Sequence, residues 1–183
     1  MTARSIPRIE DLRFLTGRGD YVADRTAPGL LEGVVLRSPH AHARLGTIAA
    51  EAARRLPGVH LVLTGEMLDA LGPLPCITAI DTVGPFVKPP RPVLARGTVR
   101  HVGDPVAFVV AETRAQALDA AEAIEVAYDP LPPVTDLAAA VAPDAPQLWA
   151  EAPGNTSFVF RRGDAAAVQA AMDSAAHVIE AEL

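Results

Sequence analysis

The sequence predicts an α/β fold of the α+β type, in which strand–helix–strand units share a mixed sheet and precede the start of a second domain. Residues 106–111 are small, apolar and β-branched, which is typical of a strand buried on both faces. Residues 113–122 then have the pattern of a short helix, and residues 124–128 alternate as a half-buried strand. These three elements follow one another without a break and predict one compact unit.

Local signals mark the ends of this unit. Gly103-Asp104-Pro105 is turn chemistry ahead of the first strand. Thr113 and Gln116 have the spacing of a capping box, in which hydroxyl and amide each satisfy a backbone N–H at the helix start. The predicted buried face of the helix consists of Ala117, Leu118 and Ala121.

A second strand–helix–strand unit precedes the first in the chain. We expect strands at 30–36, 45–48 and 59–64, with a short helix at 49–56. The two units resemble each other in element order only, because no repeat is visible at the level of residues.

Two stretches are predicted to be loops because they are rich in proline, which lacks a backbone donor. Residues 72–92 form a long surface loop or a contact with a partner, and residues 93–99 return to an extended segment. Residues 130–153 link two structural units, with a short helix possible at 135–141.

The C-terminal residues predict the start of another unit. Residues 155–160 and 177–183 have strand patterns, and Asp164 is placed to cap the helix between them. The apolar face of that helix consists of Val168, Ala171, Met172 and Ala175. No turn follows the last strand, so we expect the chain to be part of a longer protein.

Composition excludes several classes of protein. Of the 183 residues 50% are hydrophobic, which argues against disorder, and abundant alanine predicts tight helix–sheet packing. A formal net charge of −6 argues against nucleic-acid binding. The absence of a long apolar run and of a signal-peptide core predicts a cytoplasmic protein.

We expect no catalytic, cofactor-binding or metal-binding residue in this sequence. His40 and His42 could share one face, but they lack a third ligand at a recognisable spacing, which favours hydrogen bonding in a turn over metal binding. Cys76, the only cysteine, is expected to be inert rather than reactive. Gly17 and Gly19 start a dinucleotide-type glycine pattern, but Val22 stands where its third glycine should be.

Four stretches together resemble a known family: residues 8–45, 56–68, 99–136, which include VRHVGDPVAFVVAETRAQALDAAEAIEVAYDPLPP, and 153–183. The sequence resembles the N-terminal part of the molybdopterin-binding large subunit of the xanthine dehydrogenase, aldehyde oxidase and aerobic carbon monoxide dehydrogenase family. The resemblance implies an α/β hammerhead domain at 17–133 and the beginning of a molybdopterin-binding domain at 155–183. The mixed charges and scattered apolar residues of 1–16 predict an N-terminal docking arm, and residues 134–154 are predicted to be the linker.

The resemblance also implies what the complete protein does. Such subunits carry a molybdenum cofactor and oxidise an aldehyde, an N-heterocycle or carbon monoxide with oxygen from water, while iron–sulfur (2Fe–2S) and flavin (FAD) partners take the electrons. The residues that hold the pterin and the catalytic base would lie downstream, so none is carried over to this chain. Two hypotheses stay open: a non-catalytic scaffold and assembly part of such an enzyme, or a stand-alone hammerhead interaction module.

Overall fold

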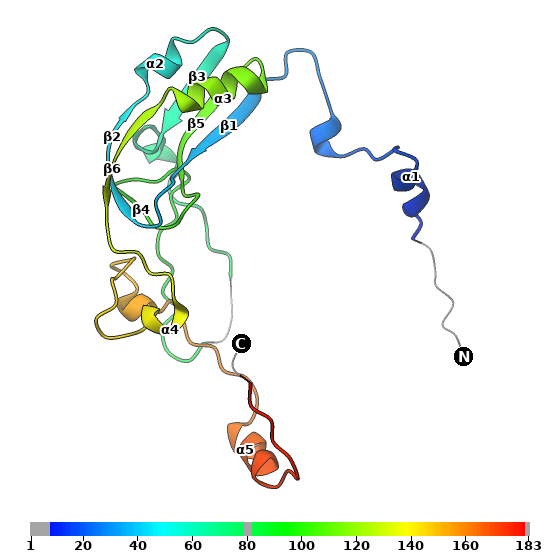
Figure 1. Cartoon of the computed structure of the whole chain (residues 1–183), viewed down its shortest axis with the longest axis vertical. Helices are drawn as coiled ribbons and strands as arrows, with labels where there is room; N and C mark the ends of the chain where they lie inside the picture. The colour runs from blue at the N-terminus through cyan, green and yellow to red at the C-terminus, as the bar shows by residue number, and fades with distance from the viewer. Residues whose placement is uncertain (1–7, 79–81, 182–183) are drawn as a thin grey trace.

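The computed structural model describes residues 8–78 and 82–181, and Figure 1 shows their arrangement. Two three-stranded sheets form the centre of the molecule, and we call residues 32–130 the two-sheet body. The α/β class is confirmed. Every strand pair in the described part of the chain is antiparallel, which corrects the expected mixed sheet.

The first sheet has the strand order β1-β5-β3. Its central strand is β5 (Pro105–Ala111), flanked by β1 (Glu32–Arg37) and β3 (Val59–Thr64). Gly33 of β1 leaves room for the Phe108 ring, because a Cβ atom at Gly33 would lie 2.7 Å from Phe108 Cζ. Strand β5 is therefore flanked on both edges. Val106, Ala107, Val109 and Ala111 are buried but Phe108 and Val110 are only partly buried, so the burial predicted on both faces is complete on one face only.

The second sheet has the order β4-β2-β6, formed by β4 (Thr98–Val99), β2 (Ala43–Ala49) and β6 (Glu125–Pro130). The β2–β6 register shifts between Leu45 and Ile48. Within that shift, a Cβ at Gly46 would come within 3.1 Å of Ala127 Cβ, so a glycine allows the two strands to approach.

Each strand–helix–strand unit runs from one sheet into the other. The first leads from β2 through α2 (Glu51–Arg54) to β3, and the second from β5 through α3 (Arg114–Glu122) to β6. Because β2 pairs with β6 and β3 with β5, the two units pair strand by strand. The predicted similarity in element order thus corresponds to two interlocked units.

Alanine dominates the main core between the helices and the first sheet, as the composition predicted. Its buried members are Ala50, Ala53, Val62, Ala107, Val109, Ala111, Ala117, Ala120, Ala121 and Ile124. A smaller cluster of Ala43, Ala95, Val99 and Val106 fills the space at the second sheet. Small side chains let the helix backbones approach the sheet closely, so the core needs few aromatic residues.

Two details of α3 differ from the prediction. Leu118 is 42% exposed, and Ala120 takes its place on the buried face, because the close approach to the sheet favours the smaller side chain. Thr113 caps the helix by accepting from Gln116 N at 3.3 Å, as expected. The Gln116 amide Oε1 accepts from the Thr113 hydroxyl instead of the amide returning to the backbone, so only half of the capping box forms.

The N-terminal described residues contain the short helix α1 (Asp11–Leu15) and the 3-10 turn η1 (Val22–Asp24), neither with a buried residue. Figure 1 shows them standing away from the two-sheet body. The Phe14 and Tyr21 rings stack at 5.8 Å between centroids, so this segment packs mainly on itself. Residues 1–7 of the expected docking arm lie outside the described residues.

Beyond β3, the 3-10 segment η2 (Gly65–Leu71) leads into the proline-rich loop, where Leu74 and Arg91 form an isolated antiparallel bridge. After β6 come α4 (Leu137–Ala140), the 3-10 turn η3 (Pro153–Asn155) and α5 (Ala165–Asp173). Asp164 caps α5 as predicted, by accepting from Ala167 N at 3.0 Å.

The two strands predicted near the C-terminus are wrong in the described residues. Neither residues 156–160 nor residues 177–181 form a strand. A strand needs a partner edge, and residues 156–160 accept only two separate backbone hydrogen bonds from the proline-rich loop, at Ser157 O and Val159 O. Residues 182–183 lie outside the described residues.

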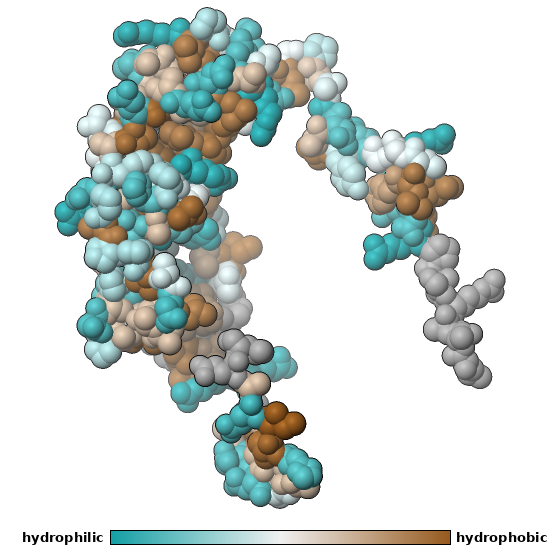
Figure 2. Space-filling view, viewed as in Figure 1, coloured by the Kyte–Doolittle hydropathy of each residue, from teal (hydrophilic) through white to brown (hydrophobic). Residues whose placement is uncertain are grey.

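Residues 156–181, which we call the tail, expose their apolar side chains. Val168 and Met172 of α5 are 57% and 51% exposed, and Figure 2 shows hydrophobic residues on the surface of this helix. The described residues contain no helix that is both long and apolar enough to cross a membrane.

Candidate functional site

The described residues contain no group of three or more His, Cys, Asp or Glu side chains that could hold a metal ion. The expectation that this chain has no catalytic, cofactor or metal residue stays a prediction. The most extensive side-chain contacts lie instead where the two-sheet body meets the residues that follow it, around Arg100.

His40 and His42 lie in the turn between β1 and β2, and their contacts are structural. His42 is buried, its Nδ1 lies 2.8 Å from Pro132 O, and its carbonyl accepts from Leu131 N at 2.9 Å. The His40 ring packs against Tyr128 at 4.7 Å between centroids. Both histidines thereby attach the turn to the end of β6.

Cys76 is exposed in the proline-rich loop. Hydrogen bonding from Thr78 lowers the pKa of its thiol, with smaller contributions in the same direction from Lys88 and Arg91. Sequence patterns do not predict this neighbourhood, because Lys88 and Arg91 come near Cys76 only through the folding of the loop.

Arg100, directly after β4, connects the two-sheet body to residues 134–155, which we call the connecting segment. Its Nε donates to Leu148 O at 2.6 Å, and its guanidinium lies 3.8 Å from the centre of the Trp149 ring. Its backbone N–H donates to Asp104 Oδ2 at 2.9 Å. One side chain thus makes a hydrogen bond and a cation–π contact with the same strip of chain.

The environment of Arg100 is partly dry. Burial lowers the pKa of its guanidinium, while the carboxylates of Asp104 and Glu151 act in the opposite direction. An arginine stays protonated after such a shift, so the positive charge persists where water is scarce.

Asn155 holds the connecting segment together from its other end. Its Oδ1 accepts from Leu148 N, and its Nδ2 donates to Ala140 O and Pro146 O, each at 2.9 Å. Asn155 has a φ of 53°, a left-handed conformation that asparagine tolerates better than most residues. Residues 134–155, the predicted linker, are therefore held together by the Asn155 side chain and bound to the two-sheet body through Arg100.

The first residues of the tail attach to the proline-rich loop. Val83 N donates to Val159 O and Val87 N donates to Ser157 O, both at 2.8 Å. The Phe86 and Phe158 rings lie 4.9 Å apart. These contacts attach the start of the tail to the proline-rich loop of the two-sheet body.

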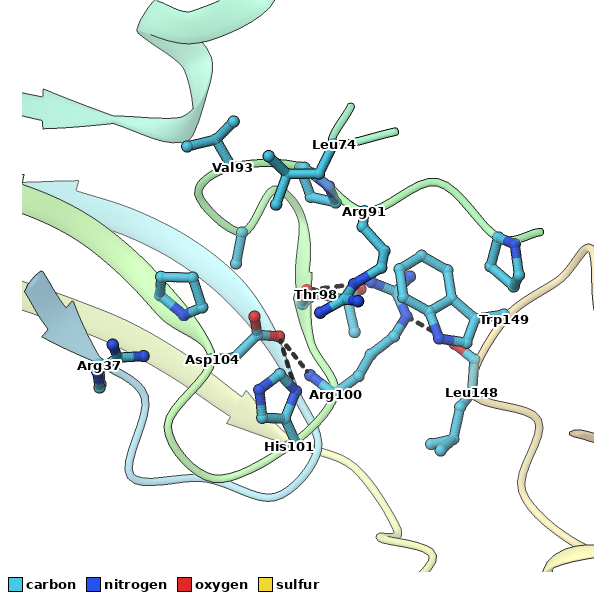
Figure 3. A pocket seen from close by; sticks show the side chains of 14 residues that line it. Arg37, Leu74, Arg91, Val93, Thr98, Arg100, His101, Asp104, Leu148 and Trp149 are labelled. Atoms are coloured by element: carbon cyan, nitrogen blue, oxygen red, sulfur yellow. Dashed lines mark hydrogen bonds and ion pairs between the residues drawn. The ribbon is translucent and has the colours of Figure 1, made fainter. Parts of the chain in front are cut away.

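A pocket of about 500 Å³ opens beside Arg100. Figure 3 shows Arg91 and Arg100 next to Trp149, with Asp104 and His101 on the side of Arg100 that faces away from Trp149. Its walls come from the proline-rich loop, the residues around β4 and the connecting segment. A second cavity of about 490 Å³ shares Pro92, Arg100 and Trp149 with it.

Sequence reasoning assigned no role to Arg100, Trp149 or Asn155. The only usable signals were the single tryptophan of the chain and an asparagine directly after a Pro-Gly pair. Neither signal names a partner, because Arg100 and Leu148 are 48 positions apart in sequence.

The sequence matches the family described as "Aldehyde oxidase and xanthine dehydrogenase, a/b hammerhead domain" over residues 16–132. It is 44% identical over 141 residues to the carbon monoxide dehydrogenase large chain of Afipia carboxidovorans, covering 77% of this chain and 17% of that protein. It is 37% identical over 182 residues to the nicotine 6-hydroxylase large subunit of Paenarthrobacter nicotinovorans, covering 97% of this chain and 21% of that one.

Among solved structures, quinoline 2-oxidoreductase from Pseudomonas putida 86 aligns with a TM-score of 0.69 and 45% identity. That alignment covers 77% of this chain and 18% of the solved one. The chain thus spans about a fifth of the length of the curated relatives it matches.

Proposed function

We propose a scaffold function for this chain, which belongs to the aldehyde oxidase and xanthine dehydrogenase family of a/b hammerhead domains. In this proposal the chain is the non-catalytic N-terminal part of a molybdenum hydroxylase large subunit. The observation that carries it is the match to such subunits across nearly the whole chain, at a small share of their length.

The geometry supports a scaffold role. The two-sheet body has its own alanine-rich core, and Arg100 and Asn155 hold the connecting segment that leaves it. After the connecting segment, the tail exposes the side chains of Phe160, Val168 and Met172. Exposed apolar side chains in such number favour a larger structure that packs on the tail.

The division of the chain belongs to the proposal as well: an arm at 1–16, the hammerhead domain at 17–133, a linker at 134–154 and the start of a molybdopterin-binding domain at 155–183. The whole protein would carry a molybdenum cofactor and work with iron–sulfur and flavin partners. The described residues contain no group of three or more His, Cys, Asp or Glu side chains that could hold a metal ion, and no reaction step is assigned to them.

Isolation from the encoding organism tests the proposal. The chain is tagged for affinity purification and expressed at its natural level. The purified sample should contain further domains or subunits, with stoichiometric molybdenum and iron by elemental analysis. The same chain produced alone should contain neither metal and show no flavin absorbance. Stoichiometric molybdenum in the isolated chain would contradict the non-catalytic assignment.

A stand-alone hammerhead module remains the second candidate, since the two-sheet body has a core of its own. It predicts recovery of the tagged chain without molybdenum under any native condition. An Arg100→Ala variant separates the two further. Loss of the Arg100 contacts with Leu148 and Trp149 should reduce recovery of the molybdenum-containing assembly, whereas Arg55→Ala, at an exposed position after α2, should not.

A further inference from the structure

The pocket beside Arg100 combines features that the scaffold role does not explain. It is enclosed by the proline-rich loop, by the start of β5 and by the connecting segment. A volume of about 500 Å³ falls in the range of small-ligand sites. Three separate parts of the chain therefore have to fold before this pocket exists.

Its lining carries an excess of positive charge. Arg37, Arg91 and Arg100 line it against a single carboxylate, Asp104, in a chain whose formal net charge is −6. That carboxylate is already engaged, because it accepts from Arg100 N and lies 3.8 Å from His101 Nδ1.

The arginines have neutral partners in the described residues. Arg37 donates to Gly103 O, and Arg100 donates to Leu148 O and Thr98 O. Arg91 makes no side-chain hydrogen bond or ion pair with another described residue. Arg91 and Arg100 therefore keep N–H groups that an anion could engage, and a charge-assisted hydrogen bond to an anion is stronger than one to a neutral acceptor.

The remaining wall is apolar and partly flat. Leu74, Pro92, Val93 and Leu148 line it together with the Trp149 ring. An inorganic anion would leave this surface without contacts. A ligand that places an apolar plane here and a carboxylate at the arginines would use both halves of the lining.

We propose that this pocket binds a carboxylate attached to a flat apolar group. Arg91 and Arg100 hold the carboxylate through the paired N–H groups of their guanidiniums, which match the two carboxylate oxygens. The Trp149 side of the pocket covers the apolar group. We assign no reaction to the ligand.

The test is isothermal titration calorimetry on the full chain with benzoate, at constant ionic strength. Benzoate should bind saturably, while benzamide, which has the same ring and no charge, and inorganic phosphate should each bind about tenfold more weakly or not at all. Equal affinity for benzamide or phosphate, or no saturable binding of benzoate, would overturn the proposal.

Arg91→Gln is the discriminating variant, because the Arg91 side chain makes no hydrogen bond or ion pair with another described residue. Its loss should leave the contacts of Arg100 with Leu148 and Trp149 intact. It should weaken benzoate binding about tenfold, and Arg91→Lys should restore part of the loss. The matched control is Arg161→Gln, which removes an exposed arginine from the tail and should leave the affinity unchanged. Unaltered binding by Arg91→Gln would place benzoate elsewhere.

The carboxylate could be that of a free small molecule or of an acidic side chain in a larger assembly. Benzoate binding to both the isolated chain and its native assembly identifies a free ligand. Binding to the isolated chain alone identifies a polypeptide carboxylate that fills the pocket on assembly. Either result rests on binding to the chain itself, so it is independent of whether molybdenum is recovered.

Discussion

Helices α3 and α5 are equal in length and similar in alanine content, yet α3 is partly buried and α5 is exposed. Each has nine residues and an N-cap side chain that accepts a backbone hydrogen bond. Helix α3 buries three alanines against the first sheet, whereas α5 buries none, although α5 has the more apolar sequence. Burial is thus decided by whether a sheet lies alongside, and not by the helix sequence.

The difference teaches how stability is distributed. The two-sheet body contains both clusters of buried hydrophobic residues in the described chain, and the tail contributes to neither. The same kind of substitution should therefore change stability more in the two-sheet body than in the tail.

The largest effect is expected from overfilling the core. Ala117 is fully buried between α3 and the first sheet, so Ala117→Leu should lower the free energy of unfolding by about 1–3 kcal/mol. Ala171→Leu on the exposed α5 should change it by less than about 0.5 kcal/mol. Urea unfolding followed by circular dichroism measures both. Similar losses at the two sites would show that α5 packs on the same core.

Limited proteolysis sharpens the boundary between the two regions. The hydrogen bonds of Arg100 and Asn155 protect residues 134–155, so the first cut should fall within the tail. Asn155→Ala removes three hydrogen bonds, at about 1 kcal/mol each, and should expose residues 134–155 to cleavage at least about fivefold faster.

The control for this experiment is Gln169→Ala. Its side chain bonds only to Asp173 on the same helix, so the pattern of cleavage in 134–155 should stay as in the unaltered chain. Early cleavage of 134–155 in the unaltered chain would restore the interpretation of that segment as a plain linker.

The two N-caps offer a smaller and more local comparison. Thr113→Ala should lower the cooperative unfolding free energy by about 1 kcal/mol, because α3 belongs to the core. Asp164→Ala should leave that value unchanged and instead speed hydrogen exchange at the Ala167 amide, which the Asp164 carboxylate accepts from. A global loss from Asp164→Ala would contradict the separation of the two regions.

The smallest expected effect is a pH dependence that belongs to the two-sheet body. Burial raises the pKa of Tyr128 above its usual 10.0, with hydrogen bonding to Ser38 acting the other way. The folded state then retains the Tyr128 proton longer than the unfolded state, so its contribution to stability is present below pH 10 and is lost as the pH rises through the folded-state pKa.

Tyr128→Phe checks this pH dependence, because phenylalanine has no proton to lose. The decline in unfolding free energy above pH 10 should be shallower in Tyr128→Phe than in the unaltered chain. Identical slopes would assign the decline to other groups.

Local patterns in the sequence were sufficient for most elements of the two-sheet body. Strand 59–64 was predicted with the observed bounds, and the buried run at 106–111 and the cap at Thr113 were predicted to within one residue. Alternation, β-branching and capping are properties of neighbouring residues, so they can be read without knowing the fold.

Tertiary structure alone decided the rest. It paired the two strand–helix–strand units across two antiparallel sheets. It buried Ala120 instead of the predicted Leu118, and it left residues 156–160 and 177–181 without a sheet. It also brought Arg91, Arg100 and Trp149 to one pocket from positions far apart in the chain. Such contacts depend on which surfaces meet, and a strand pattern becomes a strand only where another edge supplies its hydrogen bonds.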